Sequence, residues 1–213
     1  MNACYTTLCM KTIITLPNHS EYEHSIVKLL DGGCLEHSVS IQQELKAIFG
    51  DAIWLQEPPS LHITLMEIIA DADYGNYSRE VLFKQWYKAY SDVLQNILYS
   101  YKPLNVLFEE ILVSKRAIII KTKQSEQLND IRAKILEQVE LPLGTRTPPN
   151  ITHSTLARFL RIINVDEARK AIRHLKINEY QTIHEFSLVA DLGPPNFNNV
   201  PTTIYPLNPL SES

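Results

Sequence analysis

Two copies of a short pattern, His62-Ile63-Thr64-Leu65 and His153-Ser154-Thr155-Leu156, carry the residue types in this chain that could do chemistry. Successive side chains of a β-strand alternate between its two faces, so each His projects beside its own Thr. Two such pairs facing one cleft supply a proton acceptor, a proton donor and two hydroxyl hydrogen-bond donors. A neutral imidazole can take a proton from water while an imidazolium protonates a departing oxygen, which suits phosphoryl chemistry and requires no metal ion.

The residues around both motifs predict that each lies on a strand. Apolar residues alternate with the His and Thr of the first motif between Leu61 and Leu65. A proline-containing breaker precedes each copy, Pro58-Pro59-Ser60 before the first and Pro148-Pro149-Asn150 before the second. The surroundings therefore repeat along with the motifs.

These residues resemble the two-histidine (2H) phosphoesterase superfamily and, within it, the bacterial 2'-5' RNA ligase-like cyclic phosphodiesterases. The resemblance includes a strand that ends in Leu-Pro at Thr12 to Pro17, an aromatic-then-proline lead-in from Trp54 to His62, and the second motif with its trailing Arg, His153 to Arg158. The histidines lie 91 positions apart (153 − 62), and the likeness extends from about Lys11 to Leu207.

The resemblance implies a role for each motif residue. One histidine activates the attacking nucleophile and the other protonates the leaving ribose oxygen, while the threonines hydrogen-bond phosphate oxygens. Carried over to this chain, His153 is the expected base, His62 the expected acid, and Thr64 and Thr155 the phosphate ligands. The implied reaction opens or hydrolyses a 2',3'-cyclic phosphate on a nucleotide or an RNA end, with no cofactor and no metal.

Two further residues are predicted to bind substrate. Arg158 could attract the anionic substrate or form an ion pair at the strand end. Tyr205 falls where the family pattern has a Tyr and could stack on a base, as could Tyr74 or Tyr77.

Other functions stay open on the same residues. The family also includes phosphodiesterases for 2',5'-oligoadenylates and for cyclic-nucleotide signals, and a reversible ligase would share the site. A non-catalytic RNA-binding module on the same fold is an alternative from another class. The intact His and Thr of both motifs argue against that module, because a degenerate member would be expected to lose one of them.

Composition is typical of a globular protein, with 213 residues that are 45% hydrophobic and 21% charged. We expect an N-terminal extension, residues 1–10, followed by a single domain over residues 11–213. Apolar runs are too short to span a bilayer, and the first residues lack the build of a signal peptide, so a cytoplasmic protein without membrane partners is expected. We also expect a monomer. Cys4, Cys9 and Cys34 are expected to be ordinary thiols, since they show neither zinc-site nor disulfide spacing.

The net charge of −4 argues against a general nucleic-acid binder with a wholly basic surface. Residues 1–100 carry 6 Lys and Arg against 12 acidic residues, whereas residues 101–213 carry 14 against 12. The second half is therefore the expected phosphate-facing half.

The hydrophobic pattern predicts an α+β fold with mostly antiparallel strands and flanking helices. A strand and at least one helix precede each motif strand, which suggests two pseudo-symmetric lobes with a central cleft that carries both motifs, and the family resemblance implies the same bilobal fold. Helices are expected at 21–30, 38–49, 79–99, 125–139 and 165–174, with Gly32-Gly33 separating the first two. Besides the motif strands, strands are expected at 11–16, 52–56, 105–113, 117–121, 182–191 and 202–207. The aromatic stripe of the 79–99 helix is expected to be core.

Overall fold

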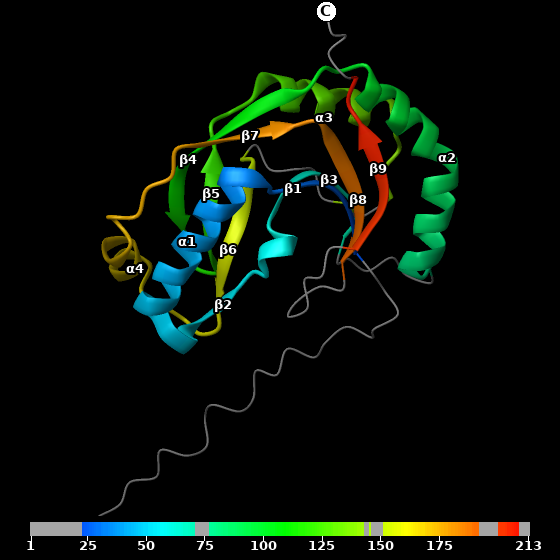
Figure 1. Ribbon diagram of the computed structural model, residues 1–213. Helices are drawn as coiled ribbons and strands as arrows, with labels where there is room; N and C mark the ends of the chain where they lie inside the picture. Colours follow the sequence, from blue (N-terminus) through cyan, green and yellow to red (C-terminus); the bar gives the residue numbers. More distant parts are fainter. Residues whose placement is uncertain (1–22, 71–76, 143–144, 146–150, 192–199, 209–213) are drawn as a thin grey trace, which may run out of the picture.

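Two antiparallel sheets form the scaffold of the chain, whose computed structural model describes residues 23–70, 77–142, 145, 151–191 and 200–208 (Figure 1). The four-stranded sheet has the order β3-β1-β8-β9, with β1 (Glu23–Leu29), β3 (His62–Ile69), β8 (Glu185–Asp191) and β9 (Val200–Pro206). The five-stranded sheet has the order β2-β6-β5-β4-β7, with β2 (Ile53–Leu55), β4 (Leu104–Val113), β5 (Ala117–Thr122), β6 (His153–Phe159) and β7 (Glu179–Ile183). The predicted α+β bilobal fold is thereby confirmed.

Each sheet has its own helices. The helices α2 (Arg79–Tyr99) and α3 (Glu126–Gln138) contact the four-stranded sheet through β3 and β9, whereas α1 (Gly32–Phe49) and α4 (Val165–Ala171) contact the five-stranded sheet. Ser78 and Ser125 cap α2 and α3, because each hydroxyl accepts a hydrogen bond from a first-turn backbone N–H. Short 3-10 turns at Gly50–Ala52 and Pro58–Ser60 flank β2.

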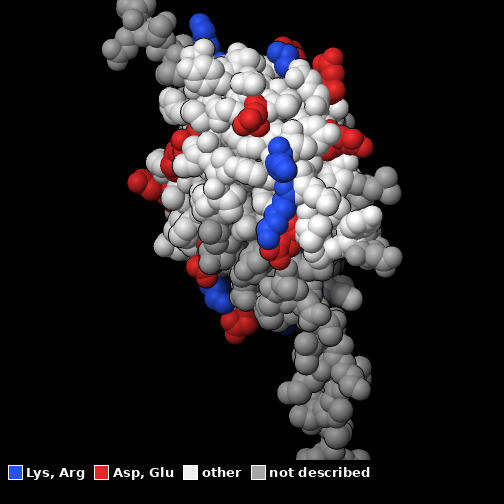
Figure 2. Space-filling view, turned by 90° about the vertical axis from the view of Figure 1, so that its right-hand side faces the viewer, with Lys and Arg blue, Asp and Glu red and all other residues white. Residues whose placement is uncertain are grey.

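The lobes are interwoven in sequence. β1 and β3 from the first part of the chain pair in one sheet with β8 and β9 from the last part. The lobes are therefore not the two halves of the chain, and the charge contrast between residues 1–100 and 101–213 does not separate them. On the face of the molecule at the α2 side, the described Lys and Arg side chains are few and lie among Asp and Glu (Figure 2).

Two element predictions are wrong. Residues 23–29 form β1 in place of the expected helix, because β1 pairs with β3 on one side and with β8 on the other. Its buried residues include the polar His24 and Lys28, so the sequence lacks the hydrophobic alternation of a strand. The expected strand 182–191 is two strands, since the chain breaks at His184 and β7 and β8 belong to different sheets. The expected strand 11–16 and the extension 1–10 lie outside the described residues.

Other element predictions are confirmed within a few residues. The helix expected at 79–99 is α2, and Trp86, Leu94 and Ile97 of its stripe are buried in the core as expected, whereas Val81 of the same stripe is 45% exposed. Gly32, which has φ +51°, does lie at an element boundary, but α1 begins there and continues to Phe49. None of the helices among the described residues is both long and apolar enough to cross a membrane.

Candidate active site

The two motif strands come from different sheets and lie against each other. β3 is the edge strand of the four-stranded sheet and begins at His62, while β6 lies second in the five-stranded sheet and begins at His153. The two strands are in contact. Positive charge on His153 lowers the pKa of His62, so the imidazoles are close enough to influence each other electrostatically. The structure thus brings both His-Thr pairs to one place.

Both imidazoles are held in the same way. The Nδ1–H of His62 donates to the Ser60 carbonyl at 2.8 Å, and that of His153 donates to the Ile151 carbonyl at 3.3 Å. In each case the acceptor lies two residues before the histidine. These contacts require the proton of the neutral ring to sit on Nδ1, which makes Nε2 the nitrogen that exchanges a proton with substrate or water.

Burial lowers the pKa of both histidines from the ordinary value of 6.5. The backbone carbonyls raise the two pKa values, but the Arg158 guanidinium lowers both, and Arg132 lowers that of His153 further. Both rings therefore favour the neutral form near neutral pH, until an anion in the site favours the imidazolium.

Each motif strand contains a β-bulge at the Leu of its motif. The register of β3 against β1 skips Leu65, and the register of β6 against β5 skips Leu156. A bulge shifts the alternation of side chains by one residue. Arg158, five positions after its His, therefore lies on the same face as His153 and Thr155, as the matching burial patterns of the two strands show.

The duplicated bulge also identifies a residue that the sequence did not indicate. Glu67 occupies in β3 the position that Arg158 occupies in β6, five residues after the motif His. The site thus has a basic residue at this position in one lobe and an acidic residue in the other. Strict alternation would have placed both on the opposite face.

The motif threonines are half-buried beside the histidines. Within the described part of the chain, no protein group hydrogen-bonds the hydroxyl of Thr64 or Thr155. A β-branched side chain on a strand has a stiff χ1, so both hydroxyls are held in fixed directions. Two fixed, unengaged hydroxyls beside two imidazoles could donate to the oxygens of a bound phosphate.

Two glutamines that sequence reasoning missed support the site. Gln42 of α1 donates through Nε2 to the carbonyls of Gln56, at 2.7 Å, and Leu156, at 2.8 Å. The side chain of Gln56 in turn donates to the Ser60 hydroxyl, and the Ser60 carbonyl holds His62. Leu156 is the bulged residue of β6, and its carbonyl also accepts a hydrogen bond from the Gln56 backbone N–H at 3.0 Å, so Gln42 joins the segment after β2 to the bulge.

Tyr205 does not lie beside the motifs. It is 1% exposed on β9, at the edge of the four-stranded sheet opposite β3, and its hydroxyl contacts Ser91 of α2 at 3.3 Å. Because the ring is packed under α2, this position does not support the prediction that Tyr205 stacks on a base. Tyr77 is 63% exposed, and Tyr74 lies outside the described residues.

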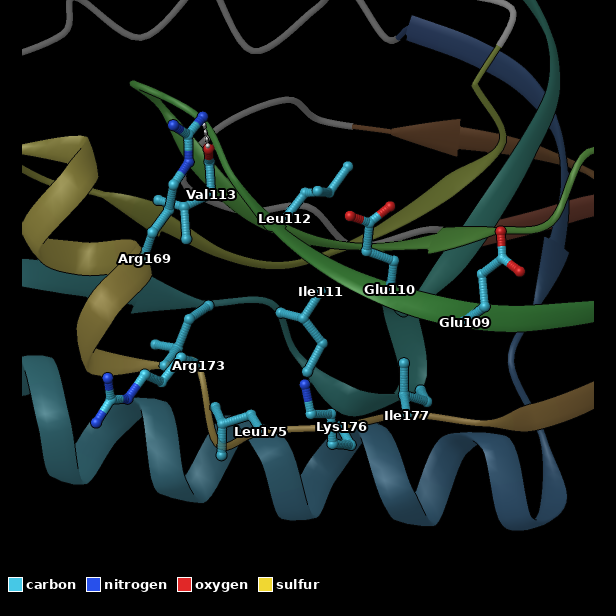
Figure 3. Close-up of a pocket in the computed structure, with 11 residues that line it drawn as sticks. Glu109, Glu110, Ile111, Leu112, Val113, Arg169, Arg173, Leu175, Lys176 and Ile177 are labelled. Carbon is cyan, nitrogen blue, oxygen red and sulfur yellow. Dashed lines mark hydrogen bonds between the residues drawn. The ribbon is translucent and has the colours of Figure 1, made fainter.

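Two cavities lie among the described residues near β4. One of about 460 Å³ lies between β4 and α4 (Figure 3). Glu109, Glu110, Arg169 and Arg173 are among its lining residues, and none of the predicted site residues lines it. The other, of about 410 Å³, adjoins the second motif, because Ile151 and Thr152 line it together with Lys121, Lys123 and neighbouring polar side chains.

Metal binding needs a cluster of ligating side chains, and thiol chemistry needs an ionisable cysteine. No cluster of three or more His, Cys, Asp or Glu that could hold a metal ion occurs among the described residues. Cys34 is buried, and burial raises the pKa of its thiol to about 12. A thiol with so high a pKa stays protonated at neutral pH. Cys4 and Cys9 lie outside the described residues.

Comparison with known proteins gives matches in structure alone. No protein-family model matches the chain, and no curated protein matches its sequence. Among solved structures, TT0787 of Thermus thermophilus is similar with a TM-score of 0.63 and 15% identity, covering 88% of this chain and 98% of that one. A structure described as a phosphoesterase has a TM-score of 0.58 with 14% identity, over 88% and 98% of the two chains.

A third similar structure is Escherichia coli LigT in complex with 3'-AMP, with a TM-score of 0.55, 15% identity, and coverage of 87% of this chain and 98% of LigT. At such low identities the likeness establishes the fold. The chain therefore has the bilobal fold of these three structures, with both of its His-Thr pairs brought together between the sheets.

Proposed function

We propose that this protein is a metal-independent phosphodiesterase that opens or hydrolyses 2',3'-cyclic phosphates on nucleotides or RNA ends. The observation that carries the proposal is the matched hydrogen bonding of His62 and His153, which fixes the Nδ1 tautomer of both rings and gives proton exchange to Nε2, beside two threonine hydroxyls. Paired imidazoles in different protonation states form an acid and a base for phosphoryl transfer.

In the proposed reaction, neutral His153 takes a proton from water as the water oxygen bonds to phosphorus. His62, protonated, gives its proton to the ribose oxygen as the bond from phosphorus to that oxygen breaks. Thr64 and Thr155 donate hydrogen bonds to the phosphoryl oxygens as negative charge develops on them. The product is a ribose phosphomonoester, and the next cycle begins after a proton returns to His62 and leaves His153.

Arg158 favours the binding of an anionic substrate, because its positive charge acts on both histidines and it lies on the same face of β6 as His153. The complex of LigT with 3'-AMP is consistent with a nucleotide phosphate in this fold. The cavity next to the second motif has Lys121 and Lys123 in its lining, so a substrate larger than the cyclic phosphate alone has room beside His153. The intact His-Thr pairs favour catalysis over a non-catalytic RNA-binding module.

The test is hydrolysis of 2',3'-cyclic mononucleotides, a cyclic-phosphate-ended RNA, 2',5'-oligoadenylate and 3',5'-cyclic nucleotides in the presence of a chelator. His62→Ala and His153→Ala are expected to abolish turnover of the cyclic phosphates. His174→Ala is the matched control, since this exposed ring pairs only loosely with Glu44, at 3.5 Å. Turnover of 2',5'-oligoadenylate alone would move the assignment to that substrate, and turnover that persists in both variants would refute the paired-histidine mechanism.

A further inference from the structure

Arg132 is a buried cation that touches both motif regions. It lies on α3 and is 7% exposed. Its Nε donates to the Leu65 carbonyl, and its Nη2 donates to the Thr64 carbonyl and to the Thr152 hydroxyl, each at 3.0 Å. Thr64 and Leu65 belong to the first motif, and Thr152 directly precedes His153. One guanidinium therefore connects the strand of one His-Thr pair to the strand of the other.

The hydrogen-bond partners of Arg132 make a purely structural role unfavourable. Its three contacts at 3.0 Å and a longer one to Asn129, at 3.4 Å, all end on neutral oxygens, and burial lowers its pKa. A buried charge balanced by neutral acceptors alone is costly, and an apolar residue of similar size is often as stable. This free-energy cost is explained if the charge attracts an anion that binds only during function.

We propose that Arg132 is a positioning residue that sets the spacing of the two His-Thr pairs and gives their site the positive potential that an anionic phosphodiester needs. The inference rests on the proposed function. A planar guanidinium with donors in a fixed fork holds three acceptors in one geometry, which an ammonium cannot reproduce. Small errors in the placement of reacting groups reduce rates strongly.

The charge of Arg132 acts among other charged groups around His153. Arg158 on β6 and His62 on β3 approach the same site. Lys121 lies opposite His153 on β5 and pairs with Glu110 of β4 at 3.4 Å. Arg132 and Arg158 are the cations that lower the pKa of His153, so removal of Arg132 should raise that pKa toward its ordinary value.

The test compares Arg132→Lys and Arg132→Met with the wild type and with Arg169→Gln. Arg169 is the matched control, because it also donates to a backbone carbonyl, that of Val113 at 3.4 Å, but is exposed on α4. Three quantities are measured: kcat and KM on a 2',3'-cyclic nucleotide, the pKa of His153 by NMR titration, and the affinity for inorganic phosphate from the same signals.

Arg132→Lys is expected to keep the lowered pKa of His153 but to lose kcat on the order of 100-fold. Arg132→Met is expected to lose as much kcat, to raise the pKa of His153 and to bind phosphate more weakly, while Arg169→Gln changes none of these. The proposal is overturned if Arg132→Lys keeps the wild-type kcat, or if a folded Arg132→Met leaves both the pKa and phosphate binding unchanged. A wild type without turnover would refute the proposed function, whereas the titration and phosphate binding would still decide the role of Arg132.

Discussion

Each motif histidine has its ring fixed by one backbone carbonyl and its charged form disfavoured by burial and nearby cations. These features have different consequences for catalysis. The carbonyl determines which nitrogen carries the proton, so it selects Nε2 as the reactive atom. Burial and the cations make the imidazolium unfavourable. In the proposed reaction, the negative charge of the bound phosphate would restore the protonated form that an acid catalyst requires.

The pH dependence of activity follows from these shifts. We expect a bell-shaped profile of kcat/KM, since one ring must be protonated and the other neutral, with both limbs below the ordinary imidazole value of 6.5. The profile of kcat should lie at higher pH, because the bound anion raises both pKa values. Steady-state rates across the acidic and neutral range measure both profiles. A kcat/KM that keeps rising above the ordinary value would contradict the lowered pKa values.

The threonine hydroxyls should act mainly in the transition state. Thr64→Val and Thr155→Val keep the shape and β-branching of the side chain, so the melting temperature should change little. Each is expected to lower kcat on the order of 100-fold, the effect of removing one donor to developing charge. Thr182→Val on β7 is the control, because its hydroxyl contacts Asn105 away from the motifs. Wild-type kcat in either motif variant would exclude that threonine from the phosphate site.

At the level of elements, the two bulges arrange the site. They place Arg158 and Glu67 on the faces of the His-Thr pairs, which the spacing of five residues alone would not do. The two His-Thr pairs themselves could be recognised from the sequence, because alternation on a strand and a repeated proline lead-in are local signals. A bulge depends on the neighbouring strand, so the residues around Arg158 could not predict on which face of β6 it lies.

Other elements show the same division between local and tertiary signals. Helix α2 was predictable because its apolar stripe and its Ser78 cap are local. In β1, Ile26, Val27 and Leu29 have helix-like spacing, and only the pairing with β3 and β8 makes the segment a strand. Arg132 occupies a position on the buried face of α3 between Ile131 and Ile135, where the pattern favours an apolar residue.

The bulge of β6 gives a prediction for α1. Gln42→Leu removes the side-chain donor to the buried carbonyls of Leu156 and Gln56. We expect the free energy of unfolding to fall by about 1–3 kcal/mol, since the Gln56 carbonyl loses a partner. The KM for a cyclic phosphate should rise because the bulge that directs Arg158 loosens. Denaturant unfolding and steady-state kinetics measure both effects. Gln43→Leu, exposed on the same helix, is the control, and equal effects in both variants would refute this role.

At the scale of the whole molecule, the chain passes between the sheets several times, and polar side chains connect the lobes near one of these crossings. Asp31 directly precedes α1, at the end of the crossing from β1. Its carboxylate accepts hydrogen bonds from Lys28 of β1 at 2.6 Å and from Gln181 of β7 at 2.7 Å. Lys28 and Gln181 are buried, so this cluster joins the four-stranded sheet to the five-stranded sheet.

Gln181→Leu should weaken the cluster around Asp31 without changing the chemistry of the site. Burial raises the pKa of Asp31, but the hydrogen bonds from Gln181 and Lys28 outweigh it and hold the pKa below 3.8. The stability from this carboxylate is therefore present above the unfolded-state value and is lost as the pH falls through the lower folded-state value. Loss of Gln181 should decrease the free energy of unfolding at neutral pH by about 1–3 kcal/mol. That free energy should also fall less as the pH is lowered through the folded-state pKa of Asp31.

Denaturant unfolding at neutral pH and at a series of acidic pH values measures both changes, with Thr182→Val on the exposed face of β7 as the control. Because Asp31 does not contribute to the pKa shift of either motif histidine, the pH profile of kcat/KM should stay where it is in the folded variant. A shifted profile would show that the Asp31 cluster and the site are coupled, and an unchanged free energy of unfolding would show that this cluster does not contribute to holding the lobes together.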